Sequence, residues 1–165
     1  MIREKGPGDL GWIISRHGSV YAGEFGFDAG FEVDIAEKAV DLCQKDDKFT
    51  RIWIKEEEGK NTGSIAVSRR GENTAFINFL LVLDEFRGKG IARGLMEHAR
   101  EYARRNGFTK LRLETYSCLG TARKLYASLG FCIADPVERM EKYGQTFDRE
   151  FWELEMGKNK NEHLI

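Results

Sequence analysis

The sequence predicts a mixed α/β fold built on one sheet, and three observations support this. Segments of alternating polarity separated by short polar turns between residues 50 and 83 predict an antiparallel meander. After residue 90, two stretches with helical spacing alternate with strand-like stretches. The chain of 165 residues is 41% apolar and 32% charged, which suits one globular domain with one substantial core.

The predicted organisation is simple. Residues 1–10 are polar and contain glycine and proline, so we expect a flexible lead-in. Residues 11–156 are expected to form a single domain, without internal repeats or linkers. Residues 157–165 are expected to be a fraying tail.

The front of the domain is expected to carry a short strand over Gly11–Ser15, interrupted at His17 and Gly18. A short helical turn is expected through Tyr21 and Glu24. Asp28 can then cap a helix, because the apolar residues after it fall at helical spacing. These residues are Phe31, Ile35, Ala39, Val40 and Cys43.

The remaining elements follow from alternation, helical spacing and turn residues. Strands are expected over 50–55, 62–68 and 75–83, with a hairpin turn over 69–73. A helix is expected from Gly90 to Asn106, where Asn106-Gly107 would stop it. A strand over 111–115, a helix over 119–129 and strands over 131–134 and 151–156 complete the prediction.

Composition excludes several classes of function. The 26 basic and 27 acidic residues leave a net charge of −1, so nucleic acid and anionic membranes are not expected partners. The three cysteines are widely spaced, which predicts reduced thiols in a cytoplasmic protein and no metal site. No apolar leader or membrane-length run is present in the sequence.

The segment from Ala75 to Ala103 is the most informative. A hydrophobic strand ends in a tight turn with Gly88 and Gly90, and a helix begins there. Glycines let the backbone approach a ligand, and the free N–H groups of a first helical turn favour an anion. Arg87 and Lys89 add positive charge, so the segment predicts a site for phosphate, and more specifically pyrophosphate.

Gly88 and Gly90 also allow three other interpretations. They could form a plain strand-to-helix turn. A Walker A motif does not fit their spacing. A dinucleotide motif, Gly-x-Gly-x-x-Gly, would need its third glycine at position 93, but here it is Gly94. In favour of that motif, Glu114 lies roughly where a ribose-binding acid is expected. The antiparallel meander ahead of the turn disfavours that fold.

At this point the sequence resembles the GNAT superfamily of acetyl-CoA-dependent N-acetyltransferases. Arg87-Gly88-Lys89-Gly90-Ile91-Ala92 is similar to the family's pyrophosphate loop, Arg/Gln-x-x-Gly-x-Gly/Ala. The segment 122–131 is similar to its second signature, Ala-x-x-Leu-Tyr-x-x-x-Gly-Phe. The front segment, from Gly8 to Tyr21, resembles a subgroup found fused to MarR-type regulators. The resemblance implies a central mixed sheet of about six to seven strands, antiparallel in its N-terminal half, with helices on both faces.

The resemblance also implies a site for acetyl-CoA. Its pantetheine arm would lie where the strand of Leu81, Val82 and Leu83 splays from its parallel neighbour. The backbone of residues 88–92 would hold the pyrophosphate. Many members carry Asn where this chain has Leu119, and that Asn often contacts the cofactor. The resemblance therefore does not imply this polar contact for the present chain. The implied cofactor-binding residues are Leu81, Val82, Leu83, Arg87, Gly88, Lys89, Gly90, Ile91, Ala92, Arg93, Leu119 and Arg123.

The expected chemistry is direct attack of an amine on the thioester. Tyr126 is the candidate acid for the leaving thiolate; otherwise it is a core aromatic residue. Glu24 and Glu114 are the first candidate bases and His17 the third, unless water serves. The predicted acceptor residues are His17, Tyr21, Asn78 and Tyr116. A covalent route through Cys118 is conceivable, because its place between a strand and a helix can lower a thiol pKa.

The predicted function is therefore transfer of the acetyl group of acetyl-CoA to an amine of a small molecule or peptide, without a metal. The alternative is a non-catalytic acetyl-CoA sensor or interaction domain associated with transcription regulation. The sequence leaves a homodimer open.

Overall fold

The structure is a computed structural model that describes residues 1–157. Residues 158–165, most of the predicted tail, lie outside the described residues. An eight-stranded sheet has the order β1-β2-β3-β4-β5-β8-β6, and β7 pairs with β8. The strands are β1 (Ile2–Glu4), β2 (Arg51–Glu57), β3 (Lys60–Arg69), β4 (Thr74–Val82), β5 (Lys110–Tyr116), β6 (Cys132–Ile133), β7 (Glu138–Lys142) and β8 (Gln145–Glu155).

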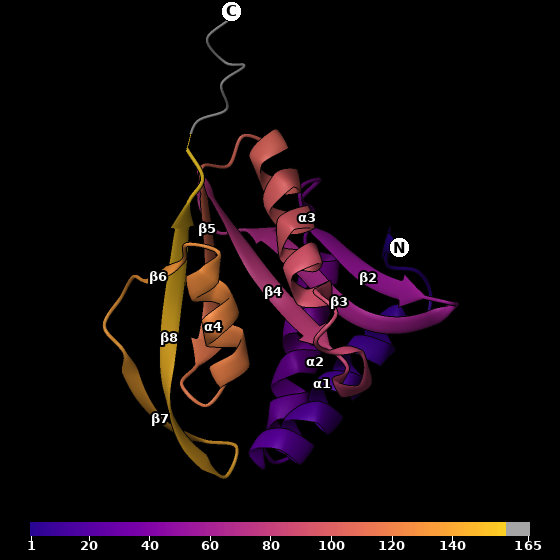
Figure 1. Cartoon of the computed structure of the whole chain (residues 1–165), viewed down its shortest axis with the longest axis vertical. Helices are drawn as coiled ribbons and strands as arrows, with labels where there is room; N and C mark the ends of the chain where they lie inside the picture. The colour runs from indigo at the N-terminus through magenta and orange to yellow at the C-terminus, as the bar shows by residue number, and fades with distance from the viewer. Residues whose placement is uncertain (158–165) are drawn as a thin grey trace, which may run out of the picture.

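Within residues 1–157, four helices and one short 3-10 turn accompany this sheet. Figure 1 shows one pair of helices, α1 and α2, behind the sheet and the other pair, α3 and α4, in front of it. The predicted mixed fold with helices on both faces is therefore confirmed. The elements are α1 (Asp9–Phe25), α2 (Ala29–Gln44), η1 (Asp84–Phe86), α3 (Ile91–Arg105) and α4 (Gly120–Ser128).

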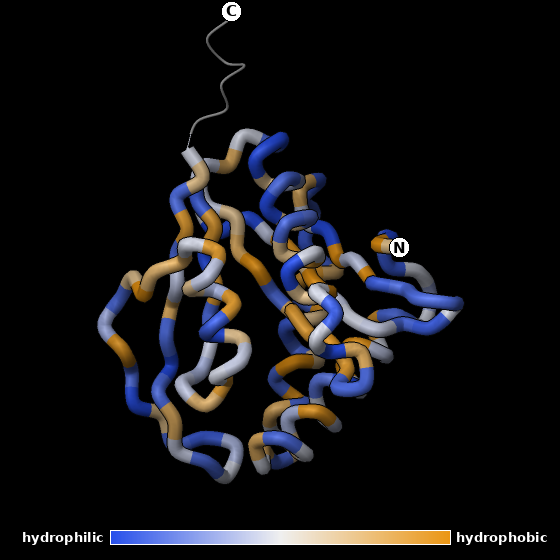
Figure 2. The backbone as a smooth tube through the Cα atoms, viewed as in Figure 1, coloured by the Kyte–Doolittle hydropathy of each residue, from blue (hydrophilic) through white to orange (hydrophobic). Residues whose placement is uncertain are grey.

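Each helix pair encloses its own apolar cluster against the sheet. The cluster on the α3 side is centred on fully buried residues such as Ile65, Leu95 and Leu111. The cluster on the α1 side contains Ile13 and Ile54, both fully buried. Figure 2, which colours the backbone by hydropathy, shows hydrophilic residues at the tip of the β2–β3 hairpin. The sheet thus separates two cores, and a cavity that joins its two faces has to pass through a break in the strands.

The first helix corrects the prediction for the front of the domain. Gly11–Ser15 was expected to be a strand, but it lies inside α1. Ile13 and His17 are buried at a spacing of four, which is a helical face. Gly18 lies inside this helix and does not interrupt it. A Cβ built there would lie 2.4 Å from Oε1 of the Glu32 side chain of α2, which occupies the space beside the glycine.

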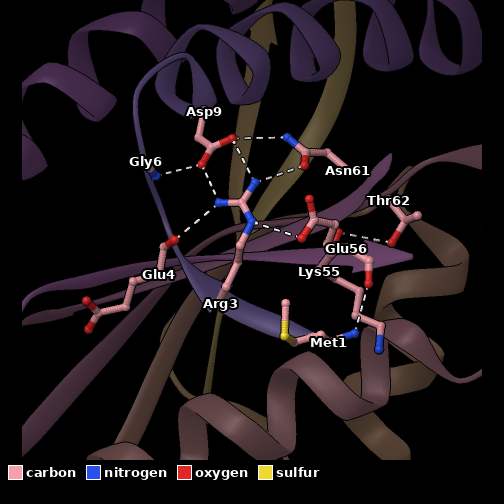
Figure 3. Close-up of polar contacts among 9 residues, drawn as sticks. All are labelled: Met1, Arg3, Glu4, Gly6, Asp9, Lys55, Glu56, Asn61 and Thr62. Carbon is pink, nitrogen blue, oxygen red and sulfur yellow. Dashed lines mark hydrogen bonds and ion pairs between the residues drawn. The ribbon is translucent and has the colours of Figure 1, made fainter. Parts of the chain in front are cut away.

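Residues 1–10 also differ from the expected flexible lead-in. Ile2–Glu4 form β1, which pairs antiparallel with β2. Arg3 Nη1 donates to Asp9 Oδ2 at 2.6 Å, and Asn61 Nδ2 donates to the other carboxylate oxygen at 3.1 Å (Figure 3). Gly6 N–H donates to Asp9 Oδ2 at 2.7 Å. This network, not visible in a local pattern, ties β1 to the start of α1.

The later elements follow the prediction with some further differences, and the last strand, β8, begins at Gln145 and not at the predicted residue 151. Asp28 does cap α2, since its side chain accepts from Gly30 N–H at 2.9 Å. However, Val40 and Cys43 are exposed on that helix, and Leu42 is buried instead. Strand β7 was not predicted; it forms a hairpin with β8 around Tyr143 and Gly144. Within residues 1–157, we find no helix with the length and apolar character needed to span a membrane.

Candidate active site

The loop between β4 and α3 has the geometry of an anion-binding turn. Gly88 and Gly90 both adopt φ 78°, a left-handed conformation that glycine reaches without steric cost. Gly90 is the N-cap of α3 and makes no side-chain capping bond. A Cβ on either glycine would meet no described atom within 4 Å. The first N–H groups of α3 therefore have room for a phosphate group.

Three basic side chains surround this loop. Arg87 Nη1 lies 2.5 Å from Glu24 Oε1 of α1, and its Nε donates to Val82 O at 3.1 Å. Arg93 donates to Ser128 Oγ of α4 at 2.8 Å. Lys89 Nζ lies 5.5 Å from the centre of the Phe86 ring. The positive charge adds to the helix dipole, so the residues present fit a pyrophosphate.

The sheet splits beside this loop. Strands β4 and β5 pair in parallel only from Thr74–Lys110 to Ile77–Leu113, and beyond that point they diverge (Figure 1). A register shift in the β3–β4 ladder falls at the same place, where Phe79 adopts φ 55°. Ser64 Oγ donates to Phe79 O at 2.6 Å and so holds this bulge. The β5-facing edge of β4 after Ile77 is thereby left to face an opening.

A cavity of about 560 Å³ occupies this opening. It extends from the glycine loop and the start of α4, between the splayed strands, to helices α1 and α2. Most predicted site residues from distant parts of the chain line it: His17, Tyr21, Glu24, Asn78, Leu81, Val82, Arg87, Gly88, Gly90, Ile91, Ala92, Arg93, Glu114, Tyr116, Leu119 and Tyr126. Its volume lies in the usual range for small-molecule sites.

Three predicted cofactor residues do not line the cavity. Leu83 N–H is bonded to Thr62 O at 2.9 Å. Lys89 is exposed and does not line the cavity. Arg123 forms a two-pronged ion pair with the buried Glu150, at 2.9 and 3.0 Å. The interpretation of Arg123 as a cofactor contact therefore finds no support in its geometry.

Tyr126 is buried on α4 and lines the cavity. Burial raises the pKa of its hydroxyl well above the ordinary value of a phenol. The group thus stays protonated at neutral pH and is able to donate a proton. Its ring also packs near Phe131 and Trp152, so it contributes to the core as well.

His17 is buried on α1, and its Nδ1–H donates to Ile13 O at 2.7 Å. This bond leaves Nε2 as the acceptor nitrogen of the ring. Burial lowers the pKa of His17 to about 4. An alkylammonium group titrates near pKa 10.4, so a proton transfer to His17 would be about six pKa units uphill. The imidazole is therefore a weak base in this position.

The two candidate carboxylates come from different elements that line the cavity. Glu24 comes from the last turn of α1 and pairs with Arg87. Glu114 comes from β5 and has looser neighbours, with Arg149 Nη1 at 3.9 Å and Lys38 Nζ at 4.0 Å. Both line the cavity and can face an ammonium group.

The predicted acceptor residues lie on the α1 side of the opening. Tyr21 stacks on Phe31 with ring centres 4.3 Å apart. Tyr116 is half-buried, and burial raises the pKa of its hydroxyl to about 12. Asn78 donates to Ser68 Oγ and Phe76 O, both at 3.2 Å. The chain therefore brings all these side chains to one wall from three elements.

Cys118 lines the cavity, but the expected direction of its pKa shift is wrong. Burial raises the pKa of the Cys118 thiol. Less thiolate is then present at neutral pH, so the residue is a poorer nucleophile than its position suggested. Leu119 is the N-cap of α4 and makes no side-chain capping bond, so its apolar side chain offers no polar contact to a ligand.

Sequence reasoning missed several wall residues. Phe25, Phe31, Asp34, Lys38 and Tyr143 also line the cavity. Asp34 accepts from the Tyr143 hydroxyl at 2.6 Å and pairs with Lys142 at 3.1 Å. The aromatic run around 21–31 was a visible signal in the sequence, whereas the contribution of the β7–β8 turn was not.

Known proteins match this chain over its central part. The sequence profile of the acetyltransferase (GNAT) family matches residues 22–131. An N-acetylaspartate synthetase of Xenopus tropicalis is 34% identical over 107 residues, which cover 62% of this chain and 40% of that protein. The N-acetyltransferase 8F1 of Rattus norvegicus is 30% identical over 108 residues, covering 62% and 45%. The chain thus spans less than half the length of these relatives.

Solved structures share the fold, over most or nearly all of the chain, at low identity. A ribosomal-protein-alanine N-acetyltransferase from Brucella melitensis gives a TM-score of 0.75 at 20% identity, covering 94% of this chain and 99% of that one. An acetyltransferase from Bacillus anthracis in complex with acetyl coenzyme A gives 0.60 at 22% identity, covering 67% and 64%.

The profile match includes both the glycine loop and the Tyr126 segment, which the structure places on one cavity. The match extends over more than half of the chain, and the fold agrees with solved acetyltransferases along nearly its full length. This chain belongs to the acetyltransferase (GNAT) family.

Proposed function

We propose that this chain transfers the acetyl group of acetyl-CoA to an amine of a small molecule or peptide. One observation carries the proposal: the cavity joins the open N-terminus of α3 to a polar and aromatic wall on α1 and α2 through the gap between β4 and β5. A cosubstrate held by its pyrophosphate on one side and an acceptor on the other would meet in that gap. The family supports this arrangement, since its fold uses acetyl-CoA.

The loop residues would bind acetyl-CoA, which supplies the acetyl group as a thioester. The N–H groups of Gly88 to Ala92 would hold the pyrophosphate, with Arg87 and Arg93 adding charge. The free edge of β4 near Leu81 and Val82 would bind the pantetheine amides and stabilise the negative charge that develops on the carbonyl oxygen. Leu119 would add only apolar contact.

Tyr126 would protonate the leaving sulfur. Its location in the wall supports this role. Burial keeps the hydroxyl protonated at neutral pH, but by raising its pKa it also makes the hydroxyl a weaker acid. A thiol has a pKa of about 8.5, so the leaving thiolate is only moderately basic and the acid assists without being indispensable.

A base must take a proton from the acceptor before or during attack, because an ammonium group has no lone pair. Glu114 or Glu24, directly or through water, would take this proton. The amine nitrogen then bonds to the carbonyl carbon while the carbon–sulfur bond breaks. Attack is direct, and the raised pKa of Cys118 disfavours a route through that thiol.

The names of relatives suggest acceptors to test. They include an N-acetylaspartate synthetase and a ribosomal-protein-alanine N-acetyltransferase, so amino acids and peptide N-termini belong in a first screen. The resemblance of the front segment to MarR-fused enzymes, and a cytoplasmic location, stay predictions. The three cysteines are free thiols, which supports the predicted cytoplasmic location.

Thermal unfolding with and without acetyl-CoA tests the cofactor site, with CoA and NAD as comparators. A ligand at a hundred times its dissociation constant adds about 2.7 kcal/mol of stability. For a domain of this size each kcal/mol raises Tm by roughly 2–4 °C. Gly90→Glu should abolish the shift, because it places a carboxylate where the pyrophosphate binds.

Gly107→Glu is the matched control. Gly107 follows the other end of α3, has φ 85° and has no atom within 4 Å of a built Cβ, so the substitution carries the same backbone strain. It should lower Tm as Gly90→Glu does but keep the acetyl-CoA shift. Stabilisation by NAD but not by CoA would overturn the proposal. Binding without turnover over a broad amine panel would favour a sensor.

A further inference from the structure

The acceptor wall of the cavity is unusually aromatic. Five aromatic side chains from four separate segments line it on the α1 and α2 side. They are Tyr21 and Phe25 of α1, Phe31 of α2, Tyr116 of β5 and Tyr143 of the β7–β8 turn. Tyr21, Phe25 and Tyr116 are only half-buried, so ring surface remains for a ligand.

These rings are held by a second layer. Phe27 and Phe147 are buried and do not line the cavity. Phe147 lies 4.5 Å from Tyr116 between ring centres, and Phe27 lies 5.3 Å from Phe31. Phe27 and Phe147 stack on each other at 5.3 Å. The lining rings therefore rest on a packed base, which fixes their orientation before any ligand binds.

Two aromatic residues in the cavity wall also adopt a backbone conformation that bulky side chains rarely adopt. Tyr143 has φ 58° in the two-residue turn with Gly144, and Phe79 has φ 55° at the bulge of β4. Such conformations cost free energy and persist where the surrounding structure imposes them. Here both place an aromatic ring on the cavity.

Charge does not provide the selection on this wall. Each carboxylate there has a cation within reach: Glu24 has Arg87 at 2.5 Å, Asp34 has Lys142 at 3.1 Å, and Glu114 has Arg149 at 3.9 Å. Because the negative and positive charges of this wall are paired, it gives no advantage to an acceptor with an extra charged group. The flat apolar surface of the aromatic rings is what remains to distinguish one acceptor from another.

We infer that the acceptor is a primary amine carried next to an aromatic ring, as in an arylalkylamine or a peptide that begins with an aromatic residue. The inference rests on the proposed function. The ring of the acceptor packs among Tyr21, Phe25 and Tyr116, and its amine points to the gap between β4 and β5. Glu24 and Glu114 flank the amine at that end.

The test compares acetyl transfer to matched amines, with product measured by mass spectrometry. Phenethylamine, cyclohexylethylamine and butylamine have similar ammonium groups and differ in the group attached. We expect kcat/KM to be roughly fivefold higher for the aromatic ring than for the saturated ring, because ring stacking adds to plain apolar burial. Butylamine should be poorer by more than about tenfold. Phenylalanine amide and a peptide with N-terminal Phe then separate a free amine from a peptide source.

Phe25→Leu should remove most of the difference between phenethylamine and cyclohexylethylamine. Val33→Ala is the control, since Val33 is 55% exposed on the outer face of α2 and lies outside the cavity wall. An acetyl-CoA-dependent Tm shift in each variant shows that it is folded. Equal transfer to all three amines, or faster transfer to L-aspartate, would overturn the inference while the acetyltransferase function stands. No transfer to any amine would overturn both.

Discussion

At the scale of single residues, Tyr126 is the group whose role is most directly testable. Tyr126→Phe removes the hydroxyl and keeps the ring in the core. We expect kcat to fall by about ten- to a hundredfold, with little change in KM for acetyl-CoA. This loss is at the lower end for an acid catalyst, because the leaving thiolate is only weakly basic. Steady-state kinetics with the best acceptor would show this, and an unchanged kcat would reduce Tyr126 to a packing residue.

The pH dependence of Tyr126 has a defined sign. Its pKa is raised by burial, so the acid form persists from neutral pH into the alkaline range. Wild-type kcat should therefore show no alkaline loss below about pH 10, the ordinary pKa of a phenol. A loss of activity near pH 8 to 9 that disappears in Tyr126→Phe would show that the Tyr126 hydroxyl loses its proton in that range. It would contradict the raised pKa.

The Glu24–Arg87 pair couples the two halves of the site. Arg87 shares its charge with Glu24 at 2.5 Å, and this pair is about one-third exposed. Glu24→Gln frees Arg87 for the pyrophosphate, so we expect the Kd for CoA to fall roughly two- to fivefold, the range of an exposed ion pair. If Glu24 is also the base, kcat falls at the same time.

Titration calorimetry with CoA measures this change. Asp84→Asn is the matched control, because Asp84 also neighbours Arg87, at 3.6 Å, but is 87% exposed. It should leave the Kd within twofold. Weaker CoA binding in Glu24→Gln would show that the carboxylate positions Arg87 for the ligand and does not compete with it.

At the scale of elements, the network around Arg3 and Asp9 decides how β1 and α1 are joined (Figure 3). Asp9 is only 5% exposed, and the hydrogen bond from Arg3 lowers its pKa to about 2. In the unfolded chain an aspartate titrates near 3.9. The depressed pKa contributes about 2 kcal/mol of stability above pH 5, which is lost as pH falls toward 2.

Asp9→Asn should accordingly lower the unfolding free energy by about 2 kcal/mol at pH 7 and flatten its decline with acid. Urea unfolding at pH 7 and pH 4 measures both. Glu101→Gln is the control: Arg104 and Arg105 lower the pKa of Glu101 to about 2 as well, but the group is solvent-exposed within one helix. Its loss should change stability little, and an equal loss in both variants would contradict the network's role.

The elements also show why part of the fold was predictable. The glycine loop, the hairpin over 69–73 and the Asp28 cap are local signals, and each lies where its pattern placed it. Strand β1 depends on pairing with a strand about fifty residues away, so its short polar sequence gave no sign of it. Helix α1 was not predicted because the pair His17 and Gly18 was interpreted as an interruption, although both residues lie inside the helix.

The same distinction holds for the site. Most of the loop residues and Tyr126 belong to contiguous motifs, and the structure brings them to one cavity; their roles stay predictions. Asp34 and Tyr143 are 109 residues apart and join only through the tertiary fold, so no spacing in the sequence could bring them together. Arg123 belongs to a motif but serves Glu150, which shows that a motif position does not fix a side chain's partner.

At the scale of the whole molecule, the break in the sheet connects two separately packed cores. Strand β4 is paired on both edges up to Ile77 and on one edge from Asn78 to Val82. A ligand lying in the gap would complete the second edge by bonding to that free backbone. Binding should then protect a few defined segments more than it protects the sheet in general.

Hydrogen exchange with and without acetyl-CoA measures this pattern. We expect slower exchange in residues 78–82, at the first turn of α3 and at the start of α4, since these segments line the cavity. Strand β2 is the internal control, because it lies on the far side of β3 and outside the cavity wall. Equal protection of β2 and β4 would indicate only a global gain in stability. Protection confined to the glycine loop would place the pantetheine arm outside the gap, and the amine would then have to approach the thioester from elsewhere.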